Sequence, residues 1–262
     1  MLKIATYNIL HGHYSSLILE NLKLLIKKEV KIICIQEADR PFKDLLTNFF
    51  KNHKWEIIYF HKTRGCNLAI AWNPIHLNLK NTEQISLPLL SKPSFIQRLT
   101  LKNEKLHRGA LSASFIFNNK SIQITNTHLS WEGGMKQTLL QLSNLRDILA
   151  QKEEDYAVLI GDFNTFTLAP FRNFKRKKIE KVLKNNWANA FPNSTWSCDI
   201  SYWVPYDGYK LLAQILNKLH IKMRSLLDYI FVKKNIYIVS TEMLDLPGSD
   251  HRPLIIELDL NK

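Results

Sequence analysis

Short apolar runs of strand length recur along nearly the whole chain, and they restrict its possible folds more than any other feature. Leu2 to Tyr7, Lys31 to Gln36 and Ala157 to Ile160 are mainly apolar and have polar or turn-forming neighbours, which is typical of buried strands. The same reasoning predicts strands at Trp55 to Phe60, Asn67 to Trp72, Phe95 to Leu101, Gly109 to Phe117, Ser121 to Asn126, Leu226 to Val232, Ile236 to Thr241 and Leu254 to Leu258.

Helical patterns lie between some of these strands. Ile18, Leu22, Leu25 and Ile26 recur at the spacing of one helix face. Further helices are predicted at Phe42 to Phe50, Lys136 to Ala150, Phe171 to Leu183 and Leu211 to Ile221. Strands with hairpin-length links and scattered helices predict an α+β fold of two packed, largely antiparallel sheets covered by helices. No linker divides the 262 residues, so we predict one domain over residues 1–262.

Cysteine usage and hydropathy indicate the compartment. Cys34, Cys66 and Cys198 are widely spaced and fit neither a disulfide framework nor a zinc site, and Cys34 is expected to pack as a small hydrophobe. The sequence contains no transmembrane segment, and its first residues lack the pattern of a signal peptide. We therefore expect a cytoplasmic protein, and we expect a monomer.

The chain is strongly basic. It has 36 Lys and Arg against 23 Asp and Glu, which gives a formal net charge of +13. An anionic partner explains this excess: nucleic acid, an acidic membrane surface or a phosphorylated small molecule. AT-rich codon usage also explains it, because the excess is mostly Lys and accompanies abundant Asn and Ile. Both explanations stay open at this point.

Polar side chains gather at the predicted strands, most of them at strand ends. Asn8, Glu37, His128, Asp162 and Asn164 end or follow strands, Asp228 lies inside Leu226 to Val232, and Asp250 and His251 precede the last strand. Carboxylates beside apolar strands are costly unless they are paired, hydrogen-bonded or bound to a cation. Carboxylate and amide oxygens without a thiolate or histidine cluster favour a hard cation, so the sequence predicts a Mg²⁺ site that Mn²⁺ also fills.

Six segments resemble the endonuclease/exonuclease/phosphatase superfamily, whose fold is deoxyribonuclease I-like. They are Thr6-Tyr-Asn8, Ile35-Gln-Glu37, Asn126-Thr-His128-Leu129, Gly161-Asp-Phe-Asn164, Leu227-Asp-Tyr-Ile230 and Ser249-Asp-His251. They occur in the family's order over residues 6 to 251. The resemblance implies a four-layer αββα sandwich with its active site at one end.

The same resemblance implies a function for each polar residue. Glu37 would bind the metal directly, with Asn8 and Asp250 as further or water-mediated ligands. His251 would act as general base on the attacking water, oriented by Asp228. Asp162 would position the water or assist the leaving group. Asn164 would donate a hydrogen bond to a phosphate oxygen, and Arg108 would contact phosphate. His128 would contact phosphate or protonate the leaving group.

The motifs also narrow the family branch. His128 stands where apurinic endonucleases usually carry Tyr, and Leu226 to Tyr229 differs from the corresponding segment of inositol polyphosphate 5-phosphatases. No Glu near Cys66 to Trp72 matches the residue that orients the equivalent histidine in deoxyribonuclease I. The chain is more similar to deadenylases, neutral sphingomyelinases and bacterial hydrolases of the superfamily.

Three segments bear on the substrate. Lys175-Arg-Lys-Lys178 would track a nucleic-acid backbone or form a solvated helix face. The aromatic residues between Trp196 and Tyr209 would stack bases, enter a lipid interface or pack on the core. The apolar stripe from Leu212 to Leu219 would lie on an anionic membrane or cover a sheet.

The leading hypothesis for the function is a Mg²⁺-dependent nuclease that acts by direct water attack. The alternatives are a phospholipid or sphingomyelin phosphodiesterase, another phosphoester hydrolase, and a noncatalytic binding module.

Overall fold

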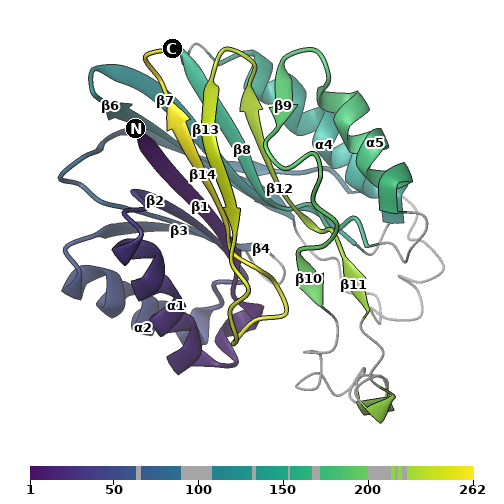
Figure 1. Ribbon diagram of the computed structural model, residues 1–262. Coiled ribbons are helices and arrows are strands. Elements are labelled where there is room, and N and C mark those ends of the chain that lie inside the picture. Colours follow the sequence, from purple (N-terminus) through teal and green to yellow (C-terminus); the bar gives the residue numbers. More distant parts are fainter. Residues whose placement is uncertain are drawn as a thin grey trace.

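The predicted strands form two six-stranded sheets in the computed structural model. It describes residues 1–62, 66–89, 108–131, 134–152, 154–166, 172–199, 214–215, 218–219 and 223–262. The first sheet has the order β13-β14-β1-β2-β4-β3 and the second the order β5-β6-β7-β8-β12-β9, and a two-stranded ribbon pairs β10 with β11 (Figure 1).

The strands have the following bounds. The first sheet contains β1 (Leu2–Asn8), β2 (Ile32–Gln36), β3 (Glu56–Lys62), β4 (Cys66–Trp72), β13 (Tyr237–Met243) and β14 (Leu254–Asp259). The second contains β5 (Asn78–Ser86), β6 (Gly109–Phe117), β7 (Lys120–His128), β8 (Tyr156–Asp162), β9 (Trp187–Asn189) and β12 (Asp228–Lys233). The ribbon consists of β10 (Cys198–Asp199) and β11 (Arg224–Ser225).

Each sheet is largely antiparallel and contains one parallel pair, β1 with β2 and β7 with β8. The helices cover the outer faces: α1 (Ser15–Lys27) and α2 (Arg40–Asn52) pack on the first sheet, and α4 (Gly134–Ala150) and α5 (Arg172–Leu183) on the second (Figure 1). The order of layers is helices, sheet, sheet, helices, which confirms the predicted four-layer αββα sandwich.

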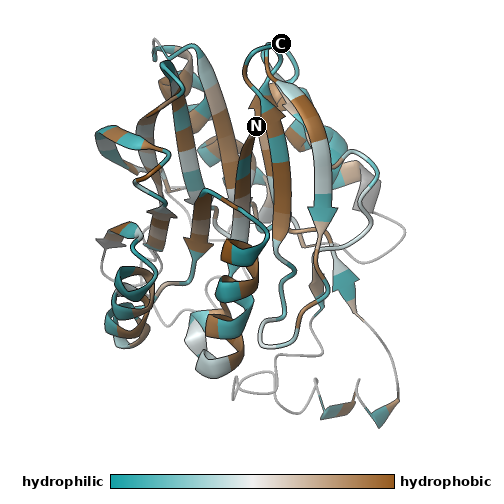
Figure 2. Ribbon diagram, turned by 60° about the vertical axis from the view of Figure 1, so that its left-hand side comes forward, coloured by the Kyte–Doolittle hydropathy of each residue, from teal (hydrophilic) through white to brown (hydrophobic). Residues whose placement is uncertain are grey.

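The apolar core lies between the two sheets. One cluster of buried side chains contains Ile4 of β1, Ile70 of β4, Phe115 of β6 and Ile160 of β8, so both sheets contribute to it. Cys34 belongs to this cluster and is fully buried, which confirms that it packs as a small hydrophobe. Figure 2 shows the central strands mainly in brown, the hydrophobic colour, whereas the helices carry both colours.

A buried polar bridge joins the sheets near one end of this core. The side chain of Asn126, on β7, donates to the backbone oxygens of Ile35 and Ala69 at 2.9 Å each and accepts a 2.6 Å hydrogen bond from Gln36. Because an unsatisfied buried amide is costly, these bonds hold the two sheets at a defined offset. The polar residues of the candidate site lie just beyond this bridge.

The predicted hairpin between β6 and β7 is confirmed, with Asn118 and Asn119 both at positive φ, as a tight hairpin turn requires. The prediction missed β5, β9, β10 and β11. β5 is an exposed, polar edge strand that carries no apolar alternation and exists through its pairing with β6. The predicted strand Phe95 to Leu101 lies outside the described residues, and so does most of the predicted helix Leu211 to Ile221.

Candidate active site

The ends of the two parallel strand pairs meet at one end of the sandwich. Asn8 ends β1, Glu37 follows β2, His128 ends β7 and Asp162 ends β8. The parallel register places His128 beside Asp162, and the Asn8 amide donates across the sheets to Oδ2 of Asp162 at 3.1 Å. The structure therefore brings these residues together.

Asn8 connects two carboxylates. Its Nδ2 donates to Oε1 of Glu37 at 3.2 Å as well as to Asp162, while its Oδ1 accepts the backbone N–H of Leu10 at 3.1 Å. The amide oxygen is thus turned toward the backbone rather than toward the carboxylates. This geometry makes Asn8 a residue that positions Glu37 and Asp162, and its role as a further or water-mediated metal ligand stays a prediction.

His251 and Asp228 form a buried pair on different strand segments. Nδ1 of His251 lies 2.8 Å from Oδ2 of Asp228, the first residue of β12. Burial by itself lowers the pKa of His251, but the Asp228 carboxylate, together with Asp250, raises that pKa well above its usual range. Asp228 thus fixes the orientation of the ring and leaves Nε2 on the side of Asp162, 3.8 Å from its Oδ2.

Asp162 lies between two histidine rings. Its Oδ2 is 3.6 Å from Nε2 of His128 and 3.8 Å from Nε2 of His251, and its Oδ1 accepts the backbone N–H of Asn164 at 2.8 Å. Burial raises the pKa of Asp162 to about 7, against the opposing effect of His251. A carboxyl group with that pKa changes its protonation near neutral pH.

Asn164 and His128 lie beside Asp162, and Arg108 lies near His128. The Asn164 amide donates to the backbone oxygen of Leu129 at 2.7 Å, which fixes the direction of its side chain. Burial and the nearby Arg108 lower the pKa of His128 well below its usual value, so this ring is neutral. Arg108 itself is buried and precedes β6, whose first residue, Gly109, pairs with His128.

The structure also shows contributors that the sequence prediction did not include. His11 lies in the short 3-10 helix η1 (Leu10–Gly12), with Nε2 at 3.1 Å from Oε2 of Glu37 and Nδ1 at 2.7 Å from Oδ2 of Asp39. Burial lowers the pKa of His11, but the two carboxylates outweigh it and raise that pKa to about 9. Two acids spaced by one residue after a strand, together with a histidine after Asn8, were the available signal in the sequence.

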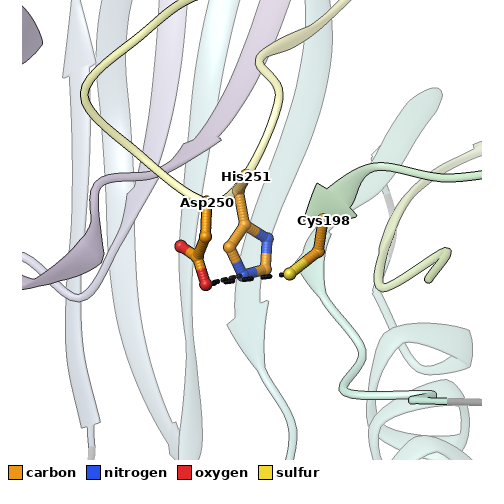
Figure 3. A group of neighbouring side chains, drawn as sticks. All are labelled: Cys198, Asp250 and His251. Carbon is orange, nitrogen blue, oxygen red and sulfur yellow. Dashed lines mark hydrogen bonds and ion pairs between the residues drawn. The ribbon is translucent and has the colours of Figure 1, made fainter. Parts of the chain in front are cut away.

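Ser197, just before β10, and Cys198, the first residue of β10, contact residues of the site. Oγ of Ser197 accepts the backbone N–H groups of Leu227 and Asp228 at 2.9 Å each. Cys198 pairs with His251 in an isolated antiparallel bridge, and its Sγ lies 3.7 Å from Oδ2 of Asp250 (Figure 3). No periodic pattern marks a strand of two residues, so this contact was not predictable from the sequence.

The arrangement of donors fits a divalent cation. Oε2 of Glu37 is buried and accepts no hydrogen bond from any described residue, although His11 approaches it. Glu37 keeps only 16% of its side chain exposed, and Asp162, Asp228 and Asp250 keep 4% or less. Several buried carboxylates at one end of the sandwich form the oxygen-rich donor set that a hard cation takes.

The substrate segments are described only in part. The predicted basic helix is α5, and Phe174 and Lys177 on it are exposed. Of the aromatic residues in the predicted loop, Trp196 is described and lies between the guanidinium groups of Arg224 and Arg252, whereas Tyr202 to Tyr209 lie outside the described residues.

Among the residues that the structure describes, no helix combines the length and apolar character needed to cross a membrane.

The fold is shared with several solved structures. TDP2 from D. rerio, solved with a single-strand DNA product, aligns with a TM-score of 0.72 at 15% sequence identity and 98% coverage of each chain. A mannosyl-6-phosphatase from Bacteroides thetaiotaomicron aligns with a TM-score of 0.69 at 14% identity, over 99% of this chain and 100% of the other. The catalytic domain of human nocturnin, with bound sulfate, gives a TM-score of 0.68 at 18% identity, over 98% and 94% of the two chains.

No curated protein sequence matches the chain significantly. The sequence profile of the Endonuclease/Exonuclease/phosphatase family, in contrast, matches residues 5–251, a range that includes every candidate site residue from Asn8 to His251. The chain therefore belongs to the Endonuclease/Exonuclease/phosphatase family and is a metal-dependent phosphoric ester hydrolase.

Proposed function

We propose that the protein is a Mg²⁺-dependent nuclease, in which Mn²⁺ also serves, and that it hydrolyses phosphodiester bonds by direct attack of water. The observation that carries this proposal is the convergence of the His251 and Asp228 pair with Asp162, 3.8 Å from Nε2 of His251. A separation of 3.8 Å is too long for a direct hydrogen bond, but one water molecule can bond to both atoms. That water is the nucleophile in this proposal.

His251 takes the proton from this water. Asp228 holds the ring through Nδ1, so Nε2 is the nitrogen that faces the water, as in the histidine and aspartate pair of serine hydrolases. Asp162, with a pKa raised to about 7 by burial, is suited to orient the water and to exchange a proton with the leaving group near neutral pH.

Three side chains receive the phosphate. Nδ2 of Asn164 uses one hydrogen for Leu129 and retains a second for a phosphate oxygen. His128 is neutral because burial lowers its pKa, which favours phosphate contact over proton donation. The Arg108 guanidinium lies close enough to affect that pKa and contributes a positive charge beside the phosphate.

Glu37 and Asp250 would hold the cation, and Asn8 orients Glu37. Oε2 of Glu37, a buried oxygen that accepts no hydrogen bond from the described residues, would be the ligand atom in place of its contact with His11. When bound, the cation supplies positive charge that polarises the phosphate and offsets the carboxylates that raise the pKa of His251.

The basic surface near the site favours nucleic acid over smaller phosphoesters. The chain has a net charge of +13, and Lys177, Lys181 and Phe174 of α5 are exposed. Lys175 of the same helix donates to the backbone oxygen of Phe166, two residues beyond Asn164, which connects the start of α5 to the site. Exposed cations with an adjacent aromatic ring suit the backbone and bases of a single strand.

One observation favours a phospholipid phosphodiesterase as the second candidate. Ile215 and Leu219 are 46% and 60% exposed, and Lys218 lies beside them. Apolar side chains next to a cation suit an anionic lipid surface. The nuclease comes first because Lys175 of α5 bonds to the backbone of Phe166, two residues after the site residue Asn164.

The first test measures Mg²⁺-dependent and Mn²⁺-dependent hydrolysis of plasmid DNA, single-stranded RNA, sphingomyelin vesicles and bis-p-nitrophenyl phosphate. We expect cleavage of nucleic acid that EDTA abolishes and that His251→Ala lowers by at least about 10²-fold. His76→Ala is the matched control and should retain full activity, because His76 contacts Lys31 just before β2, whereas Glu37 follows the other end of that strand. Hydrolysis of vesicles alone would replace the nuclease with the lipid candidate, and turnover of none of the four would refute both.

The salt dependence of binding tests α5 separately. We expect Lys177→Gln/Lys181→Gln to weaken binding of a catalytically inactive His251→Ala protein to single-stranded DNA and to reduce the slope of log K against log [salt] by about 1 to 2. Lys54→Gln/Lys80→Gln is the control: it removes the same charge from positions just before β3 and near the start of β5, away from the strand ends that carry the site. An equal effect of both pairs would show that α5 does not contact the strand.

A further inference from the structure

Cys198 is the only thiol beside the candidate catalytic residues in the described part of the chain. Its Sγ, Oδ2 of Asp250 and Nε2 of His251 lie within 4.8 Å of one another, and all three residues are buried (Figure 3). A thiol is not a ligand for Mg²⁺, and the phosphate chemistry proposed above gives it no task. The combination of sulfur, imidazole and carboxylate is typical of zinc sites.

We propose that Cys198, Asp250 and His251 form a second metal site, which binds a thiophilic divalent cation such as Zn²⁺ or Cd²⁺ and thereby withdraws His251 from the reaction. The binding of the cation stands independently of the function proposed above. The inhibition that follows from it rests on that function.

The distances between the ligand atoms fit a tetrahedral zinc ion. Zn–S of about 2.3 Å and Zn–O and Zn–N of about 2.0 Å place sulfur and oxygen about 3.5 Å apart, and nitrogen and oxygen about 3.3 Å apart. The structure has 3.7 Å from Sγ of Cys198 to Oδ2 of Asp250, and 3.9 Å from that oxygen to Nε2 of His251. These two distances exceed the tetrahedral values by about 0.2 Å and 0.6 Å, and all three ligand atoms lie within 4.8 Å of one another, so small rotations of the three side chains would bring them onto one zinc ion.

The backbone holds the ligands in place before any cation arrives. Asp199 N–H donates to the backbone oxygen of Asp250, and Arg252 N–H donates to that of Ser197, each at 2.7 Å. These two bonds flank the pairing of Cys198 with His251. Because both ligands are fixed by backbone hydrogen bonds, the cation orders little of the chain when it binds.

Asp228 prepares His251 as a ligand. Its carboxylate lies 2.8 Å from Nδ1, so this nitrogen keeps its hydrogen, and Nε2 is the nitrogen that releases its proton when a cation binds beside Cys198 and Asp250. A carboxylate behind a ligating histidine is the usual outer support of protein zinc sites. Asp162, Asp228 and His251 also lie close enough to ligate one ion, but that group offers no sulfur.

Cd²⁺ titration of the EDTA-treated full chain tests the site without a substrate. A thiolate bound to Cd²⁺ has a charge-transfer absorption in the near ultraviolet, which oxygen and nitrogen ligands lack. We expect one equivalent of this absorption in the wild-type protein and in Cys34→Ala, whose thiol is in the core between the sheets. We expect Cys198→Ser and Cys198→Ala to lose it while their far-ultraviolet circular dichroism stays native.

A variant with Cys34→Ala and Cys66→Ala, which keeps Cys198 as its one thiol, provides the opposite control and should retain the absorption. Absence of the band from the wild-type protein, or its persistence in a folded Cys198→Ser, would overturn the proposal. Asp228→Asn should weaken Cd²⁺ binding by about 10-fold to 100-fold, because it removes the support behind His251.

The inhibition is measured as the Zn²⁺ concentration that halves Mg²⁺-dependent turnover. We expect Cys198→Ser to raise this concentration by at least about 100-fold relative to the wild-type protein, because a soft ligand is lost. Equal inhibition of both proteins would contradict the site. A Cd²⁺ band in a protein that turns over no phosphoester would sustain the metal site and refute the proposed function, so the two failures are distinguishable.

Discussion

Nδ1 of His251 lies 2.8 Å from Oδ2 of Asp228, and Oγ of Ser197 accepts the backbone N–H of Asp228 on the other side. The histidine precedes β14 of the first sheet, whereas Asp228 begins β12 of the second. The pair therefore spans both sheets, and its geometry depends on how they pack.

Replacing Asp228 by Asn should lower kcat by at least about 10², because the amide no longer holds the ring in the tautomer that leaves Nε2 free. The fold should persist, since Asn has nearly the same shape. Steady-state kinetics over a range of pH checks this, with Asp147→Asn on the exposed face of α4 as the control. An unchanged kcat in Asp228→Asn would refute the positioning of His251 by this carboxylate.

Asp162→Asn should stabilise the metal-free protein while it lowers kcat by at least about 10². Burial raises the pKa of Asp162 to about 7, above its usual 3.8, so the folded state binds the proton more tightly than the unfolded state. The stability linked to this proton is fully present below pH 3.8 and is lost as the pH rises through 7. Urea unfolding in EDTA should therefore show a larger gain for the variant at pH 8 than at pH 5; equal gains at both would contradict the raised pKa.

His11→Ala should destabilise the metal-free protein at low pH rather than at high pH. The pKa of His11 is raised to about 9 because Glu37 and Asp39 outweigh burial, so its stabilising effect is fully present below pH 6.5 and is lost as the pH rises through 9. The difference in free energy of unfolding between wild type and variant should shrink from pH 6 to pH 9.5. His13→Ala, in the same segment, is the comparison, and a difference that does not vary with pH would argue against the ion pairs of His11.

Gly161→Ala should destabilise the protein by at least about 3 kcal/mol. Gly161 has a φ of 137°, and a Cβ there would lie 2.0 Å from the backbone oxygen of Thr127 on the adjacent strand. Gly134→Ala, at a φ of 61° with no atom within 4 Å of the added Cβ, should cost about 1 kcal/mol. Denaturant unfolding measures the loss in free energy of unfolding for both variants. Similar losses would show that the close approach of β7 is not the reason for a glycine at position 161.

Calorimetric unfolding tests the single-domain prediction for residues 1–262. Because both sheets contribute to one core, which contains Ile4, Phe115 and Ile160, we expect one cooperative transition with equal calorimetric and van't Hoff enthalpies. Two resolved transitions would show that the sheets unfold as separate units.

The sequence by itself determined the central strands, the hairpin at Asn118 and Asn119, and the order of the motifs from Asn8 to His251. These features are local: apolar runs, turn residues and polar residues at strand ends are visible within a few positions. The polar edge strand β5 was not predictable from its own residues, because its hydrogen bonds to β6 rather than its composition make it a strand.

Only the tertiary structure decided which atoms of these residues face one another. The orientation of the Asn8 amide depends on the N–H of Leu10, the contact of His11 depends on Glu37, and the place of Cys198 depends on backbone hydrogen bonds to residues more than 50 positions away. Side-chain direction and contacts between distant segments arise when the two sheets pack, and no local pattern encodes them. For that physical reason the carboxylates and amides that meet at this end of the sandwich were predictable from the sequence, whereas the thiol beside them was not.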